Sequence, residues 1–375
     1  MLAAINENRS HHPQLQKGAD MRWNSRAFMI ASFKRARAGN LRHSRRALRV
    51  EQLENRMLLS TSLSIAAMGD SLTAPYAGKP YVAPGERNWV EQLQVLRANH
   101  VQIYDEAVAG ATSSSLLAQG QAATVADLVA HGLVDTAVLI IGGNDVAANL
   151  PSIFAGNPEP FVSTVVANIE AALTTVAAAG DVRLVVGNIP DIGITPYFQT
   201  FVTNNPFLLQ EVTDAVTLAN QQIEAFAASR DIPVIDVFGL GHLALNPPIL
   251  GGVAVNDFYG PDGFHPETAP QGILADAVLE AIHVGYDVNT RGLRLSDQQI
   301  LTEAGIPHAP GRTFFDVSPY VIFSSPHDDE SGDTEGAAVL HAGRRLAQSA
   351  EAVDRLFSQA WEDELSDGLA SILAA

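Results

Sequence analysis

Four short motifs in the sequence contain side chains that could take part in acid–base or nucleophilic chemistry. Ser71 follows a glycine and an aspartate directly after an apolar run, and His265 stands three residues after Asp262. Two further motifs contain Gly110 and, in a Gly-Gly-Asn-Asp string, Asn144. A hydroxyl, an imidazole and a carboxylate are the groups that nucleophilic catalysis combines, provided that the fold brings them together.

Segments typical of strands and of helices alternate between these motifs. Short runs rich in Val, Ile and Leu predict strands at 62–68, 101–108, 135–141, 182–188 and 233–237. Longer stretches predict helices near 89–98, 116–131, 161–179, 208–229 and 270–284. This alternation predicts a doubly wound α/β domain whose parallel sheet is covered on both faces. The motifs would then meet at the carboxyl edge of the sheet, where ligands bind in such folds.

Taken singly, each motif also fits an ordinary turn or helix cap. As an ordered set within residues 61–286, however, the motifs resemble those of the GDSL, or SGNH, hydrolase family of esterases and lipases. The invariant residues of that family fall on Ser71, Gly110, Asn144 and His265, with the supporting acid on Asp262. The resemblance implies a flavodoxin-like, three-layer α/β/α sandwich with a five-stranded parallel sheet of order 2-1-3-4-5.

The resemblance also implies roles for these residues. Ser71 would be the nucleophile, His265 the base that takes its proton, and Asp262 the group that orients the imidazole. The backbone N–H groups of Ser71 and Gly110 and the side-chain amide of Asn144 would form the oxyanion hole. A side chain at Gly110 is expected to crowd the substrate carbonyl. The predicted activity is hydrolysis of a carboxylic ester through an acyl-enzyme on Ser71.

Two neighbouring groups are expected to have structural roles instead. Asp145 would support the turn at Asn144, and His242 would be a loop residue near the mouth of the site. Two other functions stay open, namely a carbohydrate deacetylase of the same family and a non-catalytic surface scaffold. The predicted partner is a small-molecule or glycan ester.

The segment after the fourth predicted strand is unusually dense in large apolar side chains. We expect these side chains either to form a wall for an acyl chain or to fold back against the body of the domain. They are Ile192, Ile194, Tyr197, Phe198, Phe201, Phe207 and Leu208.

Composition narrows the chemistry further. The chain has no cysteine, which excludes thiolate nucleophiles, disulfides and Cys-ligated metal centres. No metal-binding pattern is evident among its 11 histidines, so we predict a reaction without a metal or other cofactor. The net charge is −18, and the acidic body argues against nucleic acid as a partner. We see no apolar run of about 18 residues, so integral membrane association is not expected.

The two ends of the chain differ from the central domain. Residues 1–60 have a net charge of +8 and no apolar period, and are predicted to be a basic targeting or disordered segment. Within them, residues 53–59 resemble the Leu-Glu-Pro-Arg/Leu-Leu export-associated motif of planctomycete surface proteins, with Asn55 in place of proline. This resemblance predicts export to the periplasm, cell surface or medium, with a cytoplasmic location as the alternative. After the domain we expect a peripheral extension (287–323), an acidic linker (324–340) and an amphipathic helix (341–375).

Overall fold

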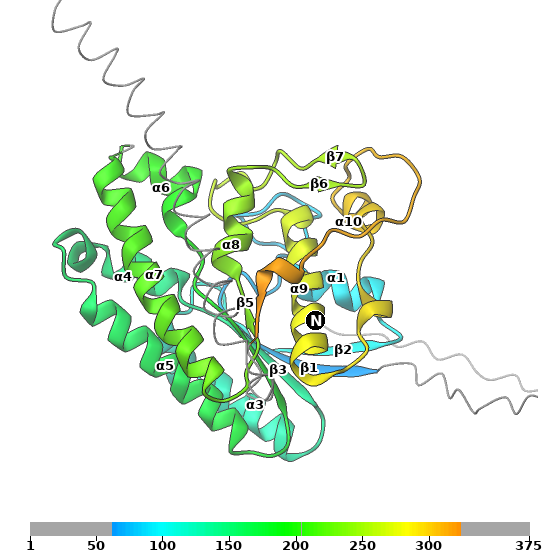
Figure 1. The fold of residues 1–375 in the computed structure, drawn as a ribbon, viewed down its shortest axis with the longest axis horizontal. Coiled ribbons are helices and arrows are strands. Elements are labelled where there is room, and N and C mark those ends of the chain that lie inside the picture. Colours follow the sequence, from blue (N-terminus) through cyan, green and yellow to red (C-terminus); the bar gives the residue numbers. More distant parts are fainter. Residues whose placement is uncertain (1–61, 204, 324–375) are drawn as a thin grey trace, which may run out of the picture. The chain divides into compact units, whose positions relative to one another are not determined.

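The computed structural model describes residues 62–203 and 205–323, and these contain a six-stranded sheet with the order β2-β1-β3-β4-β5-β8 (Figure 1). Its strands are β1 (Leu63–Gly69), β2 (Val101–Asp105), β3 (Thr136–Ile140), β4 (Arg183–Gly187), β5 (Val234–Ile235) and β8 (Val321–Ile322). The first five strands are parallel, and β8 runs antiparallel to β5. The predicted order 2-1-3-4-5 is therefore confirmed, with one strand added at the β5 edge.

Helices cover both faces of this sheet. They are α1 (Trp89–Leu96), α2 (Ser113–Ala118), α3 (Gln121–Ala130), α4 (Gly143–Phe154), α5 (Glu159–Ala177), α6 (Pro196–Phe201), α7 (Pro206–Ala228), α8 (Val237–Gly241), α9 (Thr268–Tyr286) and α10 (Asp297–Glu303). Short 3-10 turns and a hairpin complete the domain, namely η1 (Ile192–Ile194), η2 (His242–Ala244), η3 (Arg291–Leu293), η4 (Ser318–Tyr320), β6 (Ile249–Leu250) and β7 (Val253–Ala254). In Figure 1, α3, α5 and α7 lie on one side of the sheet, and α1 and α9 lie on the other. This is the predicted three-layer α/β/α arrangement.

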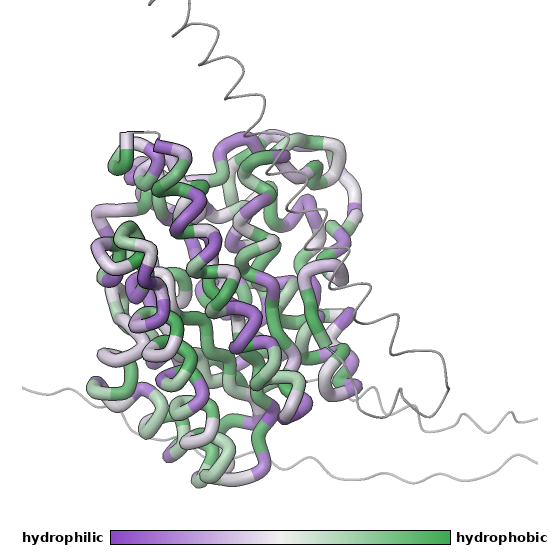
Figure 2. Tube along the Cα trace, turned by 60° about the vertical axis from the view of Figure 1, so that its left-hand side comes forward, coloured by the Kyte–Doolittle hydropathy of each residue, from purple (hydrophilic) through white to green (hydrophobic). Residues whose placement is uncertain are grey.

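Alternation along the strands builds a separate core on each face. In β1, Ala66 and Met68 pack with the layer of α3, α5 and α7, whereas Ile65 and Ala67 pack with the layer of α1 and α9. Because both faces are covered, the strands carry apolar side chains at nearly every position, as parallel strands do. Figure 2 shows this as hydrophobic colour along the strands, with hydrophilic residues recurring along the helices.

Among the described residues, one helix, α5, is long and apolar enough to cross a membrane by length and composition, with a mean hydropathy of 1.3. Its apolar face lies inside the domain, where Phe161, Val165 and Ile169 are buried. The helix packs against α3 and α7. Such packing explains the apolar composition of α5 as that of a core helix.

The single helix predicted at 116–131 is in fact two helices, α2 and α3. They are separated at Gly120, whose φ of +78° lies in the left-handed region that favours glycine. The break is short, and apolar residues continue on both sides of it, so the sequence pattern alone did not reveal it.

Residues 287–323 differ from the peripheral extension that we expected, because they contribute to the core. Leu295 and Val317 are fully buried in the layer of α9. Asp276 of α9 holds the segment, since its carboxylate accepts a hydrogen bond of 2.6 Å from the Leu295 amide and lies 3.3 Å from Arg294 Nε. The segment ends in β8, which covers the edge of β5 that would otherwise be unpaired.

Several predictions concern residues outside the described part of the chain. These are the basic segment 1–60 with its export motif, the acidic linker 324–340 and the amphipathic helix 341–375.

Candidate active site

Ser71 lies in a tight turn directly after β1. The strand ends at Gly69, whose φ is +153° and where a Cβ would clash with the carbonyl oxygen of Ile140. The turn is closed by the Asp70 side chain, whose Oδ1 accepts a hydrogen bond of 3.0 Å from the Leu72 amide. This conformation places Ser71 at the carboxyl edge of the sheet, as predicted from its position after an apolar run.

His265 lies in the loop before α9, and Asp262 shapes that loop. Asp262 Oδ1 accepts hydrogen bonds from the amides of Phe264 and His265, at 2.9 and 3.0 Å, while Oδ2 lies 2.5 Å from His265 Nδ1. Because a carboxylate can only accept, the proton belongs on Nδ1, and Nε2 is left as an acceptor. Nε2 lies 2.8 Å from Ser71 Oγ. The structure thus brings Ser71, His265 and Asp262 together in one hydrogen-bonded chain.

Two aromatic rings contact the imidazole of His265. Tyr81 stacks on it with ring centroids 4.1 Å apart and 23° between the planes, and Phe264 meets it edge-on at 5.2 Å. The Tyr81 hydroxyl is buried without a hydrogen-bond partner among the described residues. Burial raises the pKa of this phenol, which keeps it neutral. Tyr81 was not predicted from the sequence, because it stands in an irregular loop far from His265 in the chain.

Asn144 lies in the first turn of α4, next to the glycine that begins it. Gly142, which directly precedes α4, has a φ of +126°, and a Cβ there would lie 2.7 Å from the side chain of Ile189 in the loop after β4. The side-chain amide of Asn144 donates a hydrogen bond of 2.9 Å to the carbonyl of Ala111. This bond fixes the amide on the same pocket wall as Ser71.

Gly110 directly precedes Ala111, whose carbonyl accepts the hydrogen bond from Asn144. Its φ of +80° lies in the left-handed region, and a Cβ there would meet no described atom within 4 Å. The backbone conformation is therefore an observed reason for glycine at this position, and the crowding of a substrate carbonyl by a side chain stays a prediction. Among the described residues, Gly110 is also not part of the pocket wall that Ser71 and Asn144 share.

Two buried carboxylates support these turns. Asp145 accepts hydrogen bonds from the backbone N–H and the hydroxyl of Ser113, at 2.8 and 2.6 Å, and so joins α4 to α2. Burial raises the pKa of Asp145. Burial also raises the pKa of Asp70 to about 7, and the nearby Asp145 carboxylate adds to this shift.

His242 pairs with a different carboxylate, that of Asp191. Its Nε2 lies 3.2 Å from Asp191 Oδ2, and its ring stacks on Phe238 with centroids 4.6 Å apart. Asp191 is buried and also accepts hydrogen bonds of 2.9 Å from the Gly193 amide and the Thr213 hydroxyl. The pair joins the loop after β4 to the turn after α8.

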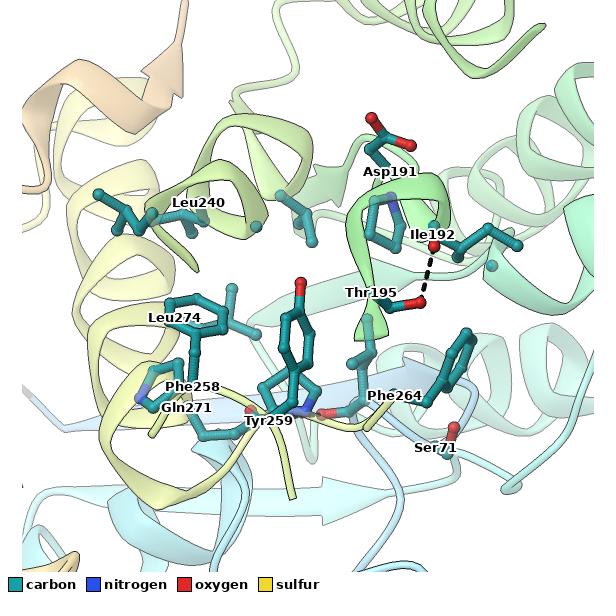
Figure 3. A pocket seen from close by; sticks show the side chains of 18 of the residues that line it. Ser71, Asp191, Ile192, Thr195, Leu240, Phe258, Tyr259, Phe264, Gln271 and Leu274 are labelled. Carbon is teal, nitrogen blue, oxygen red and sulfur yellow. Dashed lines mark hydrogen bonds between the residues drawn. The ribbon is translucent and has the colours of Figure 1, made fainter. Parts of the chain in front are cut away.

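An apolar pocket of about 80 Å³ opens beside Ser71. In Figure 3, Ser71 and Phe264 lie toward one end, Leu240 and Leu274 toward the other, and Tyr259 projects between them. Ligand sites in proteins commonly combine such apolar walls with a few polar groups.

A second and more open cavity of about 380 Å³ lies next to α6. We call it the α6 groove, and its wall includes Tyr197, Phe198 and Phe201 of α6 together with Asp262. Ile192 and Phe264 line both this groove and the pocket beside Ser71, so the two cavities meet there.

Within residues 62–203 and 205–323, no group of three or more His, Asp or Glu side chains is placed to hold a metal ion. The expectation of a reaction without a metal therefore stays a prediction that needs its own measurement.

An α/β/α sandwich with this arrangement at the carboxyl edge of its sheet belongs to the broad class of doubly wound α/β proteins. Within that class, the model of the GDSL-like lipase/acylhydrolase family matches residues 67–270, more than half of the chain. The chain therefore belongs to the GDSL-like lipase/acylhydrolase family, whose members are ester hydrolases.

The solved structures that resemble this chain are distant from it in sequence. The lipase Lip_vut3 from a goat rumen metagenome is 15% identical, with 59% of this chain and 97% of that chain covered and a TM-score of 0.45. Axe2, an acetylxylan esterase from Geobacillus stearothermophilus, is 17% identical, with coverages of 59% and 94% and a TM-score of 0.41. The lipase/acylhydrolase from Enterococcus faecalis is 18% identical, with coverages of 59% and 95% and a TM-score of 0.39. A comparison with curated proteins gave no match.

Proposed function

We propose that the protein is a serine ester hydrolase that cleaves a carboxylic ester through an acyl-enzyme on Ser71. The observation that carries this proposal is the 2.8 Å contact between Ser71 Oγ and His265 Nε2, with Asp262 2.5 Å behind the other ring nitrogen. A serine hydroxyl is a weak nucleophile unless a base takes its proton during attack. The free lone pair on Nε2 is placed for this step.

The reaction proceeds in two similar halves. Ser71 Oγ bonds to the ester carbon while its proton moves to His265 Nε2, and the carbonyl electron pair moves onto oxygen. When the carbonyl re-forms, the bond to the alcohol breaks and Nε2 returns the proton to the leaving oxygen. A water molecule then repeats the sequence on the acyl-enzyme, which releases the carboxylic acid and restores Ser71.

The oxyanion would be held by the amides of Ser71 and Gly110 and by the side chain of Asn144. One N–H of the Asn144 amide is used by the Ala111 carbonyl, so its orientation is fixed before substrate arrives. A donor held in place in this way stabilises the charge that develops in the transition state more than it stabilises the ground state.

The apolar pocket favours an acyl group longer than acetyl. Its far wall, which includes Leu240, Phe258 and Leu274, is of no use to a substrate whose acyl part is a single methyl group. A cavity needs a volume of about 10–15 Å³ to hold one water-sized group. A pocket of about 80 Å³ therefore has room for more than the single methyl group of an acetyl ester. A carbohydrate deacetylase of the same family is the alternative, and it would leave this wall without a role.

A serine-directed fluorophosphonate tests the proposal directly. We expect one adduct per chain, located on Ser71 by peptide mass analysis, and no adduct in Ser71→Ala. Ser163→Ala is a matched control, because Ser163 is exposed on α5 and its hydroxyl donates a hydrogen bond to the Glu159 carbonyl of the same helix. An unlabelled Ser71 in the folded wild-type protein would favour the scaffold alternative.

A further inference from the structure

The large apolar residues after β4 do not act as one wall. Ile192 lines both cavities, whereas Tyr197, Phe198 and Phe201 line the α6 groove. Phe207 is 71% exposed and lines neither of these two cavities. The aromatic side chains of α6 therefore belong to a cavity that is distinct from the pocket beside Ser71.

The α6 groove is attached to the histidine loop. The amide of Tyr197 donates a hydrogen bond of 3.0 Å to the carbonyl of Gly263, in the loop between Asp262 and His265. The Tyr197 ring meets Phe264 edge-on at 6.0 Å, and Phe264 meets the His265 ring at 5.2 Å. A continuous set of contacts thus connects the groove to the imidazole.

The chemistry of acyl transfer separates the two halves of an ester between two sides of the site. The carbonyl oxygen must face the oxyanion donors, and the leaving oxygen must lie within reach of the proton on His265 Nε2. Asn144, the side-chain donor, lines the pocket beside Ser71. The α6 groove meets this pocket at Phe264, whose ring contacts the imidazole of His265. This arrangement places the acyl part in the pocket and the alcohol part in the groove.

The groove has few polar groups with which to bind a sugar. The Asp262 carboxylate is already occupied by His265 and by two backbone amides. Tyr197 and Phe201 are 55% and 59% exposed, and their rings lie nearly parallel, with 12° between the planes and centroids 6.5 Å apart. A sugar hydroxyl that loses water needs a new hydrogen-bond partner, whereas an apolar group gains from covering exposed rings.

We propose that the α6 groove binds the alcohol portion of the ester, and that this alcohol is apolar, an alkyl chain of about six carbons or an arylalkyl group. The inference rests on the proposed function, because it assigns one half of that substrate. It defines the substrate class as an ester of a short acyl chain with a bulky apolar alcohol.

A series of butyrate esters tests the assignment. The alcohols are methanol, n-hexanol and 2-(2-naphthyl)ethanol, all primary alcohols, so that differences in leaving-group chemistry stay small, and 6-O-butyryl-glucose is the polar comparison. We expect kcat/KM, which reports acylation, to rise about 5- to 20-fold from the methyl to the naphthylethyl ester. The same acyl-enzyme forms in every case, so a kcat limited by deacylation stays constant across the series.

Variants of the two exposed rings locate the effect. In Tyr197→Ala/Phe201→Ala, we expect the ratio of kcat/KM for the naphthylethyl ester to kcat/KM for the methyl ester to fall most of the way to 1. Phe207→Ala is the matched control, because it removes an even more exposed ring that lies in neither cavity. It should leave the whole series unchanged. Inhibition by free 2-(2-naphthyl)ethanol should weaken in the double variant and not in the control.

The outcomes separate this inference from the proposed function. One outcome is that the wild type hydrolyses the methyl ester, Ser71→Ala does not, and kcat/KM is the same for every alcohol in the series. This outcome would overturn the groove assignment and leave the esterase proposal standing. A preference for the glucose ester would overturn the apolar alcohol. Failure to hydrolyse any ester, with no fluorophosphonate adduct on Ser71, would overturn both.

Discussion

Two Asp–His pairs of the described domain have their side chains largely shielded from solvent, and they differ in what stands beside the imidazole. In the first, Asp262 contacts His265 at 2.5 Å, and the other ring nitrogen lies 2.8 Å from the Ser71 hydroxyl. In the second, Asp191 contacts His242 at 3.2 Å, and the hydroxyl of Thr213 binds the carboxylate instead. The order of groups is Ser–His–Asp in one pair and Thr–Asp–His in the other.

This difference shows why an Asp–His contact alone does not define a catalytic site. A base must have a free lone pair directed at the hydroxyl that it activates, and only the Ser71 arrangement supplies this. In the second pair, the imidazole and the hydroxyl both stabilise a buried carboxylate. We therefore expect the first pair to determine the rate of hydrolysis and the second to contribute to the stability of the fold.

The largest expected effect comes from removing the hydroxyl of each arrangement. Ser71→Ala should lower kcat for p-nitrophenyl butyrate by about 10⁴-fold or more, because the acyl-enzyme cannot form. Thr213→Val is the matched change in the second arrangement and should alter kcat by less than about 3-fold, because Thr213 only supports Asp191. A large loss of kcat in Thr213→Val, with the fold intact, would contradict the comparison.

The next effect concerns the oxyanion. Asn144→Ala should lower kcat about 10²- to 10³-fold with a smaller change in KM, because its amide acts on charge present mainly in the transition state. Steady-state kinetics on p-nitrophenyl butyrate measure both constants. An effect confined to KM would instead mark Asn144 as a residue that only binds substrate or supports the fold.

Each imidazole has an aromatic ring stacked on it, Phe238 on His242 and Tyr81 on His265, and a sequence motif shows neither. Only the ring of Tyr81 lies against the proposed base, so the two pairs should respond differently to losing the stacked ring. We expect Tyr81→Leu to lower kcat about 3- to 30-fold with little change in KM, because the imidazolium loses a π face and its fixed orientation. Tyr81→Phe should restore the wild-type kcat, because the hydroxyl has no partner among the described residues. Equal losses in both variants would show that the hydroxyl matters and the stacking does not.

The parts of the site that sequence predicted are those that local geometry determines. Asp262 and His265 lie in one loop, three residues apart, and Ser71 follows an apolar strand, so motif and periodicity were enough to find them. Tyr81 and Gln121 could not be found in this way. Gln121 holds the peptide before the Ser71 turn, with its side chain 3.0 Å from the Gly69 nitrogen and 3.2 Å from the Gly69 oxygen. Such contacts depend on the packing of elements that are distant in the chain.

The fold shows the same division. The five parallel strands have apolar runs bounded by turn residues, and their order matches the family that the motifs indicated. The two-residue strand β8 has no period to recognise, and beside its pairing with β5 the Asp236 amide donates a hydrogen bond of 2.9 Å to the carbonyl of Tyr320. Short elements held by long-range hydrogen bonds are therefore the part of the fold that the sequence did not predict.

Asp70 shows what burial does to a carboxylate that has no histidine partner. Its pKa is raised to about 7 from an ordinary value of 3.8, so the folded protein binds its proton more tightly than the unfolded chain does. Folding stability from this group therefore falls as the pH rises from about 4 to 7. Asp70→Asn keeps an oxygen for the Leu72 amide and should remove this fall. We expect the difference in melting temperature, variant minus wild type, to be larger at pH 8 than at pH 5. The same difference at both pH values would contradict this prediction.

The smallest expected effect on hydrolysis comes from His242, and it tests the comparison from the other side. His242→Leu leaves the buried Asp191 carboxylate with two of its donors, from Gly193 and Thr213. Losing one partner of a buried polar group costs about 1–3 kcal/mol, which lowers the melting temperature by about 2–4 °C per kcal/mol in a domain of this size. Hydrolysis of p-nitrophenyl butyrate below the new melting temperature should stay within about 2-fold of wild type.

His265→Leu should do the reverse and abolish hydrolysis with a smaller change in melting temperature. The carboxylate that loses its partner in this variant is Asp262, which is more exposed to solvent than Asp191. If His242→Leu abolished hydrolysis in the folded protein, both pairs would belong to the reaction, and the distinction between them would fail.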